Sequence, residues 1–281
     1  MDNLYSPMIK LKNNKLFHFV NFTLLCVFLI VAFNSSAENI DDDFSKAVDA
    51  EEKRTKWGTE EFKKELIKEM SSANIALFID EHLGGIKEPS RIYYRFEKKS
   101  TREDNFVGNV VLNIVKVDDD DTKHITFRYL KGRNKVRFPP QIGARGNPVF
   151  MLFFERDCRD MQRLTGGNAL FFRSRIRHTI AATDVADVDI NHDGIKIKAK
   201  RISFQPFTKT KLKNRVSRYK TKKFDVIISD KIPGYIYKIE TYIKDTEHPD
   251  DMVREVLVYQ GIRTNKELRR DYREKKGENE S

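Results

Sequence analysis

The chain has 281 residues and a formal net charge of +11 at pH 7. The charge is scattered, with acidic runs at residues 41–43 and 118–121, so the clustered basic residues of a nucleic-acid-binding protein are missing. There are only two cysteines, and one of them lies in an N-terminal segment that we expect to be removed. The mature chain therefore cannot form an intramolecular disulfide.

Residues 1–37 have the order of a secretory signal peptide. Three lysines precede an apolar run at residues 16–33, and Ser35 and Ala37 supply the small residues of a cleavage site. We expect cleavage after Ala37 and a periplasmic mature protein. Its net charge is about +9, because the signal contains three lysines and one aspartate.

The alternative for this segment is an uncleaved inner-membrane anchor at residues 16–33. The run is 18 residues long, close to the roughly 20 that a membrane span needs, but three polar residues interrupt it. Cleavage is therefore favoured. Cys26 has bulky neighbours, which disfavours lipidation, and Met1 and Met8 are both possible starts. No later stretch is apolar enough to span a membrane.

Residues 38–89 are predicted to be an N-terminal helical segment. Thr59 is a suitable N-cap, and apolar residues recur at helical spacing from Phe62 to Phe78. The glycine pair at residues 84–85 is expected to end this helix.

Residues 90–262 have the periodicity of an antiparallel β domain. Apolar and polar residues alternate in its third run, which suits a sheet packed on one face. The charged tail at residues 263–281 lacks apolar periodicity and is expected to be a frayed helix or disordered. The predicted strands are residues 91–97, 106–117, 123–132, a short 135–138, 185–191, 194–207, 219–229, 234–244 and 254–262.

A helical hairpin is predicted at residues 147–183, inserted between these strands. Asn147 and Pro148 begin the first helix, Gly166 ends it, and Asn168 caps the second. The predicted fold is therefore α+β. It consists of a large curved antiparallel sheet, half-open like a barrel, with a helical hairpin in mid-chain and an N-terminal helix.

Metal sites are weakly supported. Residues 189–194 match the first half of a calcium loop, but Lys200 stands where the closing glutamate is needed, so a hairpin turn is favoured. The acidic run at residues 118–121 is expected to be a solvated turn. None of the six histidines has zinc-binding spacing. No metal and no other cofactor is predicted.

Cys158, with His178 as its base, is the one candidate nucleophile. However, Phe154, Cys158 and Met161 share one helical face, which favours a core cysteine. The sequence also lacks a Gly-x-Ser-x-Gly elbow and a phosphate-binding loop. The protein is therefore predicted not to be an enzyme.

The hairpin supplies the candidate binding residues. Arg173 and Arg177 share a face without an acid at helical spacing, so they either pair with acids of the first helix, the commoner outcome, or meet an anionic ligand. Phe171, Phe172 and Ile176 are expected to face the sheet, whose concave surface could hold an acyl chain. Packing alone explains the strand aromatics more readily than such a cavity.

The segment NPVFMLFFERDCRDMQRLTGGNALFFRSRIRHTI resembles a family of uncharacterised exported proteins of proteobacteria. The likeness rests on Glu-x-Asp, Met-x-Arg-Leu-Thr-Gly-Gly and Phe-Arg-x-Arg-Ile-Arg, and it extends through FPPQIGARGNPV and ISDKIPGYIY. It implies no activity. More loosely, an exported sheet with inserted helices is similar to the periplasmic lipoprotein-carrier (LolA-like) fold, a likeness of architecture that assigns no residue roles.

These observations favour a non-catalytic periplasmic or cell-envelope binding or carrier protein for a lipid or a lipidated partner, in which Arg173 or Arg177 meets a head group. The alternative is an envelope structural or assembly factor that docks a protein or peptidoglycan through its basic surface and charged tail. A hydrolase using Cys158 is the third and least favoured hypothesis.

Overall fold

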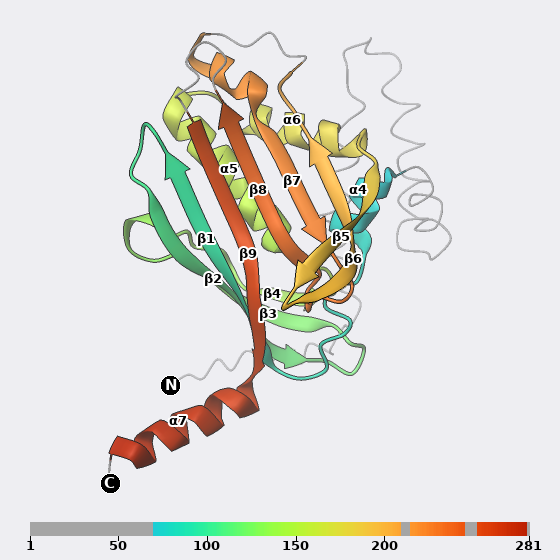
Figure 1. Cartoon of the computed structure of the whole chain (residues 1–281), viewed down its shortest axis with the longest axis vertical. Helices are drawn as coiled ribbons and strands as arrows, with labels where there is room; N and C mark the ends of the chain where they lie inside the picture. Colours follow the sequence, from blue (N-terminus) through green and yellow to red (C-terminus); the bar gives the residue numbers. More distant parts are fainter. Residues whose placement is uncertain (1–69, 209–213, 245–251, 280–281) are drawn as a thin grey trace, which may run out of the picture. The chain divides into compact units, whose positions relative to one another are not determined.

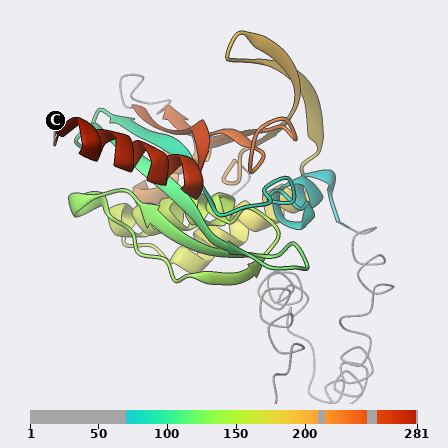
Figure 2. The same cartoon turned by 90° about the horizontal axis from the view of Figure 1, so that it is seen from below.

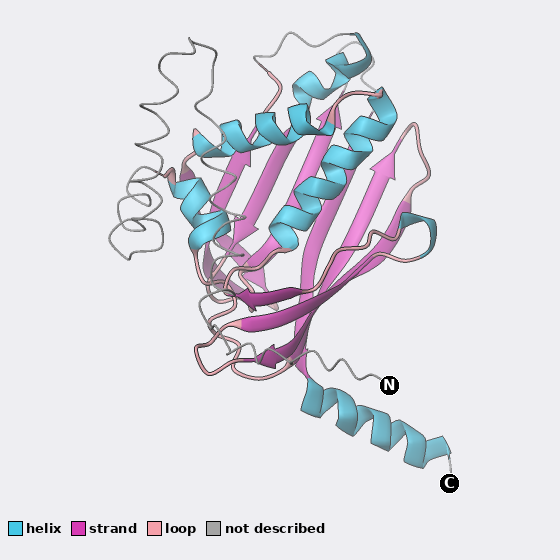
Figure 3. Cartoon of the chain, turned by 180° about the vertical axis from the view of Figure 1, so that it is seen from behind, coloured by secondary structure: helices cyan, strands magenta, loops and turns pink. Residues whose placement is uncertain are grey.

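The structure, a computed structural model, describes residues 70–208, 214–244 and 252–279. These residues form one nine-stranded sheet with helices against one of its faces (Figures 1 and 3). The predicted signal at residues 1–37, its alternative reading as an anchor and the first part of the predicted N-terminal helix lie outside the described residues.

Both halves of the chain contribute to the sheet. Its strands are β1 (Ser90–Ser100), β2 (Phe106–Val117), β3 (Lys123–Tyr129), β4 (Gln141–Ala144), β5 (Val185–His192), β6 (Ile195–Phe204), β7 (Lys223–Ile228), β8 (Ile236–Lys244) and β9 (Met252–Thr264). The order across the sheet is β4-β3-β2-β1-β9-β8-β7-β6-β5. The first and last of these strands therefore pair, antiparallel, in the middle of the sheet.

The helical hairpin covers one face of this sheet, together with a shorter helical segment (Figure 3). Helix α7 instead follows the end of β9 (Figure 1). The helical elements are α4 (Ser72–Asn74) with its π-helical continuation η2 (Ile75–Ile79), the 3₁₀ segments η3 (Gly132–Asn134) and η4 (Asn214–Thr221), the hairpin helices α5 (Val149–Thr165) and α6 (Ala169–Ala181), and α7 (Asn265–Asn279).

The hairpin follows its sequence signals. The Asn147 carboxamide oxygen accepts a hydrogen bond from the Val149 N–H at 3.1 Å. Gly166 ends α5 at a φ of 66°, a left-handed conformation that glycine adopts without steric cost. Asn168 caps α6 by accepting from the Leu170 N–H at 2.8 Å. The predicted helical hairpin is confirmed.

The sheet is curved and unclosed, as the sequence predicted. Register shifts interrupt the pairing of β1 with β9, β2 with β3, and β7 with β8, and such bulges bend a sheet. Figure 2 shows the β5–β6 hairpin projecting away from the helical layer. Asp193 and Gly194 turn that hairpin with φ values of 52° and 81°, which confirms the hairpin over the calcium loop.

The prediction of a short strand at residues 135–138 is wrong. The fourth strand is β4, and Val136 makes only an isolated bridge to Tyr129. Two prolines follow Phe138 and cannot donate ladder hydrogen bonds, so the segment leaves the sheet and the Phe138 ring packs against Phe127 and Tyr129 instead. Likewise, the first residues of the strand predicted at 219–229 belong to η4, and β7 begins at Lys223.

The predicted N-terminal helix ends earlier than expected. The described helical turns stop at Ile79, and the glycine pair at residues 84–85 lies in the turn that follows. The reason is His82, whose Nε2 lies 2.8 Å from the Ala76 carbonyl oxygen while its Nδ1 accepts from the Asn147 N–H at 3.1 Å. The chain turns back on itself to bury this ring.

The charged tail is helical. Thr264 and Glu267 form a reciprocal capping box, in which the Thr264 N–H donates to the Glu267 carboxylate at 2.7 Å and the Glu267 N–H donates to the Thr264 hydroxyl at 3.2 Å. Helix α7 therefore begins directly from β9.

Asn147 is a buried polar junction between α5 and the sheet. Its Nδ2 donates to the Tyr94 hydroxyl at 2.9 Å and to the Gly234 carbonyl at 2.8 Å. These contacts satisfy groups that water cannot reach, and leaving such groups unpaired is costly. Asn147 thus fixes where α5 enters the fold.

Replacing Asn147 with alanine is expected to lower the free energy of unfolding by about 2–4 kcal/mol, because the Gly234 carbonyl and the Tyr94 hydroxyl would lose their buried partner. Urea denaturation followed by circular dichroism measures this. Asn109→Ala, at an exposed strand position, should change the value by less than about 0.5 kcal/mol. Equal effects of the two substitutions would contradict the junction.

Candidate functional site

The hairpin residues predicted to bind a ligand divide into buried and exposed groups. Phe172 and Ile176 are buried, and the Phe172 ring packs edge-on against Phe207 and Tyr219. Phe171 keeps 37% of its surface exposed, and its ring packs edge-on against Phe172. Phe172 is therefore part of the core, and Phe171 lies at the edge of the core.

Arg173 finds its anion within the fold. Its guanidinium holds Glu155 of α5 in a two-pronged contact, Nε to Oε2 at 2.6 Å and NH2 to Oε1 at 2.7 Å. Arg159 binds the same carboxylate. Arg177 is half-buried, and burial together with the charge of Arg173 lowers its pKa. Ligand binding by these two arginines stays a prediction.

Three large apolar side chains remain exposed where the two hairpin helices meet. Leu164, Leu170 and Phe171 keep 42%, 65% and 37% of their surfaces exposed, on both sides of the Gly166 turn. We refer to these three residues as the hairpin-corner patch. Its neighbour Arg163 is already paired with Glu103 and Asp160, so the border of the patch is locally neutral.

A buried ion network joins α5 to the sheet. Arg156 binds Glu255 of β9 at 2.7 Å and Asp160 at 3.2 Å, and its guanidinium lies 4.6 Å from the centre of the Phe96 ring. Lys98 of β1 reaches Glu255 at 3.3 Å. The network consists of the basic residues Lys98, Arg156, Arg163 and Lys222 and the acidic residues Glu103, Asp157, Asp160 and Glu255.

Neighbouring positive charges keep Glu255 ionised. Burial alone would raise the pKa of Glu255, but the charges of Arg156, Lys98 and Lys222 outweigh it and hold that pKa at about 2. Asp157 behaves differently, since burial raises its pKa against the lowering effect of Lys222, 2.6 Å away. Among the described residues, Asp157 Oδ2 and the Tyr129 hydroxyl have no hydrogen-bond partner. The members nearest the sheet are buried, whereas Arg163 at the outer end keeps 56% of its side-chain surface exposed. We assign the network a structural role.

Cys158 is not arranged as a nucleophile. Only 1% of its surface is exposed, and burial raises the pKa of its thiol well above the usual range. His178 is exposed, with Ser174 Oγ 3.3 Å from its Nδ1. Within the described ranges no group of three His, Cys, Asp or Glu side chains could hold a metal ion.

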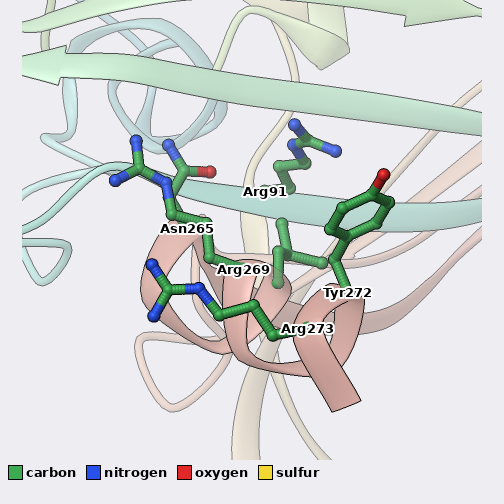
Figure 4. A pocket seen from close by; sticks show the side chains of 6 residues that line it. Arg91, Asn265, Arg269, Tyr272 and Arg273 are labelled. Carbon is green, nitrogen blue, oxygen red and sulfur yellow. The ribbon is translucent and has the colours of Figure 1, made fainter. Parts of the chain in front are cut away.

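A cavity of about 420 Å³ lies between α7 and β1 (Figure 4). No residue of this cavity was singled out from the sequence. The spacing of Thr264 and Glu267, which form a capping box, was the one local signal that α7 begins there. The lining residues are Arg91, Asn265, Leu268, Arg269, Tyr272 and Arg273.

No family model and no curated protein matches the chain. The resemblance of residues 147–180 to an exported proteobacterial family therefore stays a prediction. In the part of the chain that the structure describes, no helix has the length and hydropathy of a membrane span.

Solved structures of low identity are similar to this chain. One is the Pseudomonas aeruginosa MucA/MucB complex (7% identity, TM-score 0.28, 66% of this chain and 55% of that chain). Others are a putative outer membrane lipoprotein-sorting protein domain from Vibrio parahaemolyticus (8%, 0.22, 63% and 86%) and a LolA superfamily protein from Nitrosomonas europaea (11%, 0.20, 69% and 93%). This chain spans about half the length of the chain that it matches in the MucA/MucB complex. The latter two are of the architectural class that the sequence resembles, but likeness at this level assigns no ligand or residue role.

Replacing Glu255 with glutamine should leave Arg156 and Lys98 with a buried excess of positive charge. We expect the free energy of unfolding at pH 7 to fall by about 3–5 kcal/mol. The folded pKa of Glu255, about 2, lies below its unfolded value, so its stabilisation is complete above roughly pH 5 and is lost as the pH falls towards 2. Urea unfolding of both proteins between pH 7 and 3 should show the difference shrinking.

The charge of Glu255 also helps to raise the pKa of Asp157, so the comparison reports the two neighbouring carboxyl groups together. Glu81→Gln, at an exposed pair with Arg145, is the matched control and should show little change. A difference that stays constant down to pH 3 would contradict the assigned role of Glu255.

The thiol of Cys158 should resist alkylation in the folded protein. Iodoacetamide at pH 8 is expected to leave the mature chain unmodified by mass spectrometry, and to label it once urea unfolds it, because the buried thiol forms little thiolate. Rapid labelling of the folded chain would instead revive the hydrolase hypothesis.

Proposed function

We propose that the protein is a non-catalytic binding or carrier protein of the cell envelope, exported to the periplasm, which contacts a lipid or a lipidated partner through the hairpin-corner patch. The observation that carries this proposal is the exposure of Leu164, Leu170 and Phe171 at one corner of the fold. The three residues lie close in the sequence, on either side of the Gly166 turn, and exposed apolar side chains gathered in one region of a surface are characteristic of interaction sites.

The packing of the hairpin supports a contact at this corner rather than beneath the helices. Phe153, Phe154, Phe172 and Ile176 occupy the space between the hairpin and the sheet and are all buried. The cavity that the sequence suggested under the hairpin is therefore filled by the protein's own side chains along these positions. An acyl chain would lie against the corner, where burying it adds about 0.8 kcal/mol per methylene group.

The size of the hairpin-corner patch sets the expected strength of ligand binding. Covering three partly exposed side chains contributes about 2–4 kcal/mol, at roughly 25 cal/mol for each Å² of apolar surface. That corresponds to a millimolar contact at best, before any contribution from the rest of the ligand. The patch therefore suits a ligand that is held transiently and passed on.

The second candidate is an envelope assembly factor that docks a protein or peptidoglycan. The observation in its favour is α7, a capped basic helix beside the cavity at β1. The third, a hydrolase, is disfavoured by the burial of Cys158.

Replacing Leu164, Leu170 and Phe171 together with serine should weaken binding of a fluorescent acyl lipid by about 5- to 30-fold, since the lost apolar contact is worth about 1–2 kcal/mol. Fluorescence titration measures the dissociation constant. The matched control replaces Ile195 and Val107, which are 66% and 53% exposed elsewhere on the sheet. Equal affinity of wild type and corner variant, with unfolding midpoints unchanged, would contradict the proposal.

A further inference from the structure

The cavity between α7 and β1 is built by the junction of β9 with α7. The Asn265 N–H donates to the Pro89 carbonyl at 2.9 Å, just before β1 begins, and the capping box at Thr264 and Glu267 starts the helix at the same point. Positions 265, 268, 269, 272 and 273 are three or four residues apart, so they lie along one face of α7. That face borders Arg91 of β1 (Figure 4).

Three arginines and no acid line this cavity. They are Arg91, Arg269 and Arg273. Neither Arg269 nor Arg273 has an acidic partner among the residues that the structure describes. Arg91 donates from Nε to the Asn113 carboxamide oxygen at 3.3 Å, an amide contact that leaves its charge uncompensated.

The nearby acids are committed elsewhere. Asp271 pairs with Arg263, Glu267 closes the capping box and Glu88 binds Lys266 at 3.1 Å. Arg91 also stands opposite Arg263 in the pairing of β1 with β9, a cross-strand arrangement of like charges that is unfavourable by itself. Among the described residues, no acid lines the cavity to balance its three positive charges.

The chemistry of the lining selects the class of anion. A guanidinium binds carboxylate or phosphate oxygens in pairs, and three guanidinium groups offer more donors than one carboxylate can accept. A phosphate monoester presents three terminal oxygens and a charge of about −1.5 to −2 at pH 7. The Asn265 carboxamide and the Tyr272 hydroxyl can add donors, while Leu268 and the Tyr272 ring supply apolar surface.

We propose that this cavity binds the phosphate group of an organic phosphate monoester, with the carbon portion of the ligand against Leu268 and Tyr272. A volume of about 420 Å³ lies within the usual range of small-molecule sites, roughly 300–1,000 Å³, and is larger than a phosphate ion alone requires. The phosphate comes either from a lipid head group or from a soluble ester. This site is separate from the hairpin-corner patch.

The test is titration calorimetry of the purified protein with glycerol 3-phosphate, and with glycerol as the uncharged comparison. We expect binding of glycerol 3-phosphate that weakens as salt is added. Arg269→Gln combined with Arg273→Gln should weaken it at least about tenfold, through loss of charge-assisted hydrogen bonds. Lys266→Gln combined with Arg270→Gln removes the same charge from other positions of α7 and should change affinity less than about twofold.

Arg91→Gln changes the same site on β1 and leaves the sequence of α7 intact. Weaker binding by this variant therefore cannot be caused by a disturbed α7. It should also weaken glycerol 3-phosphate binding, with the helical circular dichroism signal unchanged. Absence of binding to the wild-type protein, or equal weakening by the Lys266 and Arg270 substitutions, would overturn the proposal.

Sedimentation with vesicles of phosphatidic acid in phosphatidylcholine identifies the source of the phosphate. Binding that depends on Arg91, Arg269 and Arg273 indicates a lipid head group, and glycerol 3-phosphate binding without vesicle binding indicates a soluble ester; both support the phosphate site. Serine substitutions in the hairpin-corner patch should leave glycerol 3-phosphate binding unchanged, so this proposal and the proposed function can fail independently.

Discussion

The contact between Arg156 and Glu255 is the interaction on which the arrangement of layers depends. Both side chains are buried, and they join the middle of α5 to β9, the middle strand of the sheet. A buried charge is tolerated only when it is paired and hydrogen-bonded, so α5 cannot slide along the sheet without separating the ions. Lys98 and Asp160 also contact the pair, so all four charges are matched in this register.

This constraint determines which part of the hairpin stays exposed. Asn147 fixes the start of α5 and the ion network fixes its middle, so Phe153 and Phe154 are held in the core against the sheet. Exposed apolar surface then remains at the end of the hairpin, where Gly166 turns the chain and Leu164 and Leu170 stay exposed. The proposed contact therefore lies at the corner because the middle of α5 is fixed to the sheet.

Local signals in the sequence predicted most of the fold, and contacts between distant residues were missed. The caps at Asn147 and Asn168 and the glycine at residue 166 each depend on residues a few positions apart, and the structure has all of them. Glu255 stands 99 residues from Arg156. The role of Glu255 can be inferred only once β9 is known to pair with β1, and the periodicity of a strand does not say which strand it pairs with.

For the tail the sequence left two alternatives open, a frayed helix or disorder, and the structure has a helix. Thr264 and Glu267 have the spacing of a capping box, a local signal that favours the start of a helix even where apolar periodicity is missing. Because α7 begins at this point, Arg269 and Arg273 line the same cavity as Arg91. The hairpin corner and α7 lie at opposite ends of the sheet (Figure 1). The two proposed surfaces are therefore separate regions of the fold, and the sheet that lies between them holds them apart.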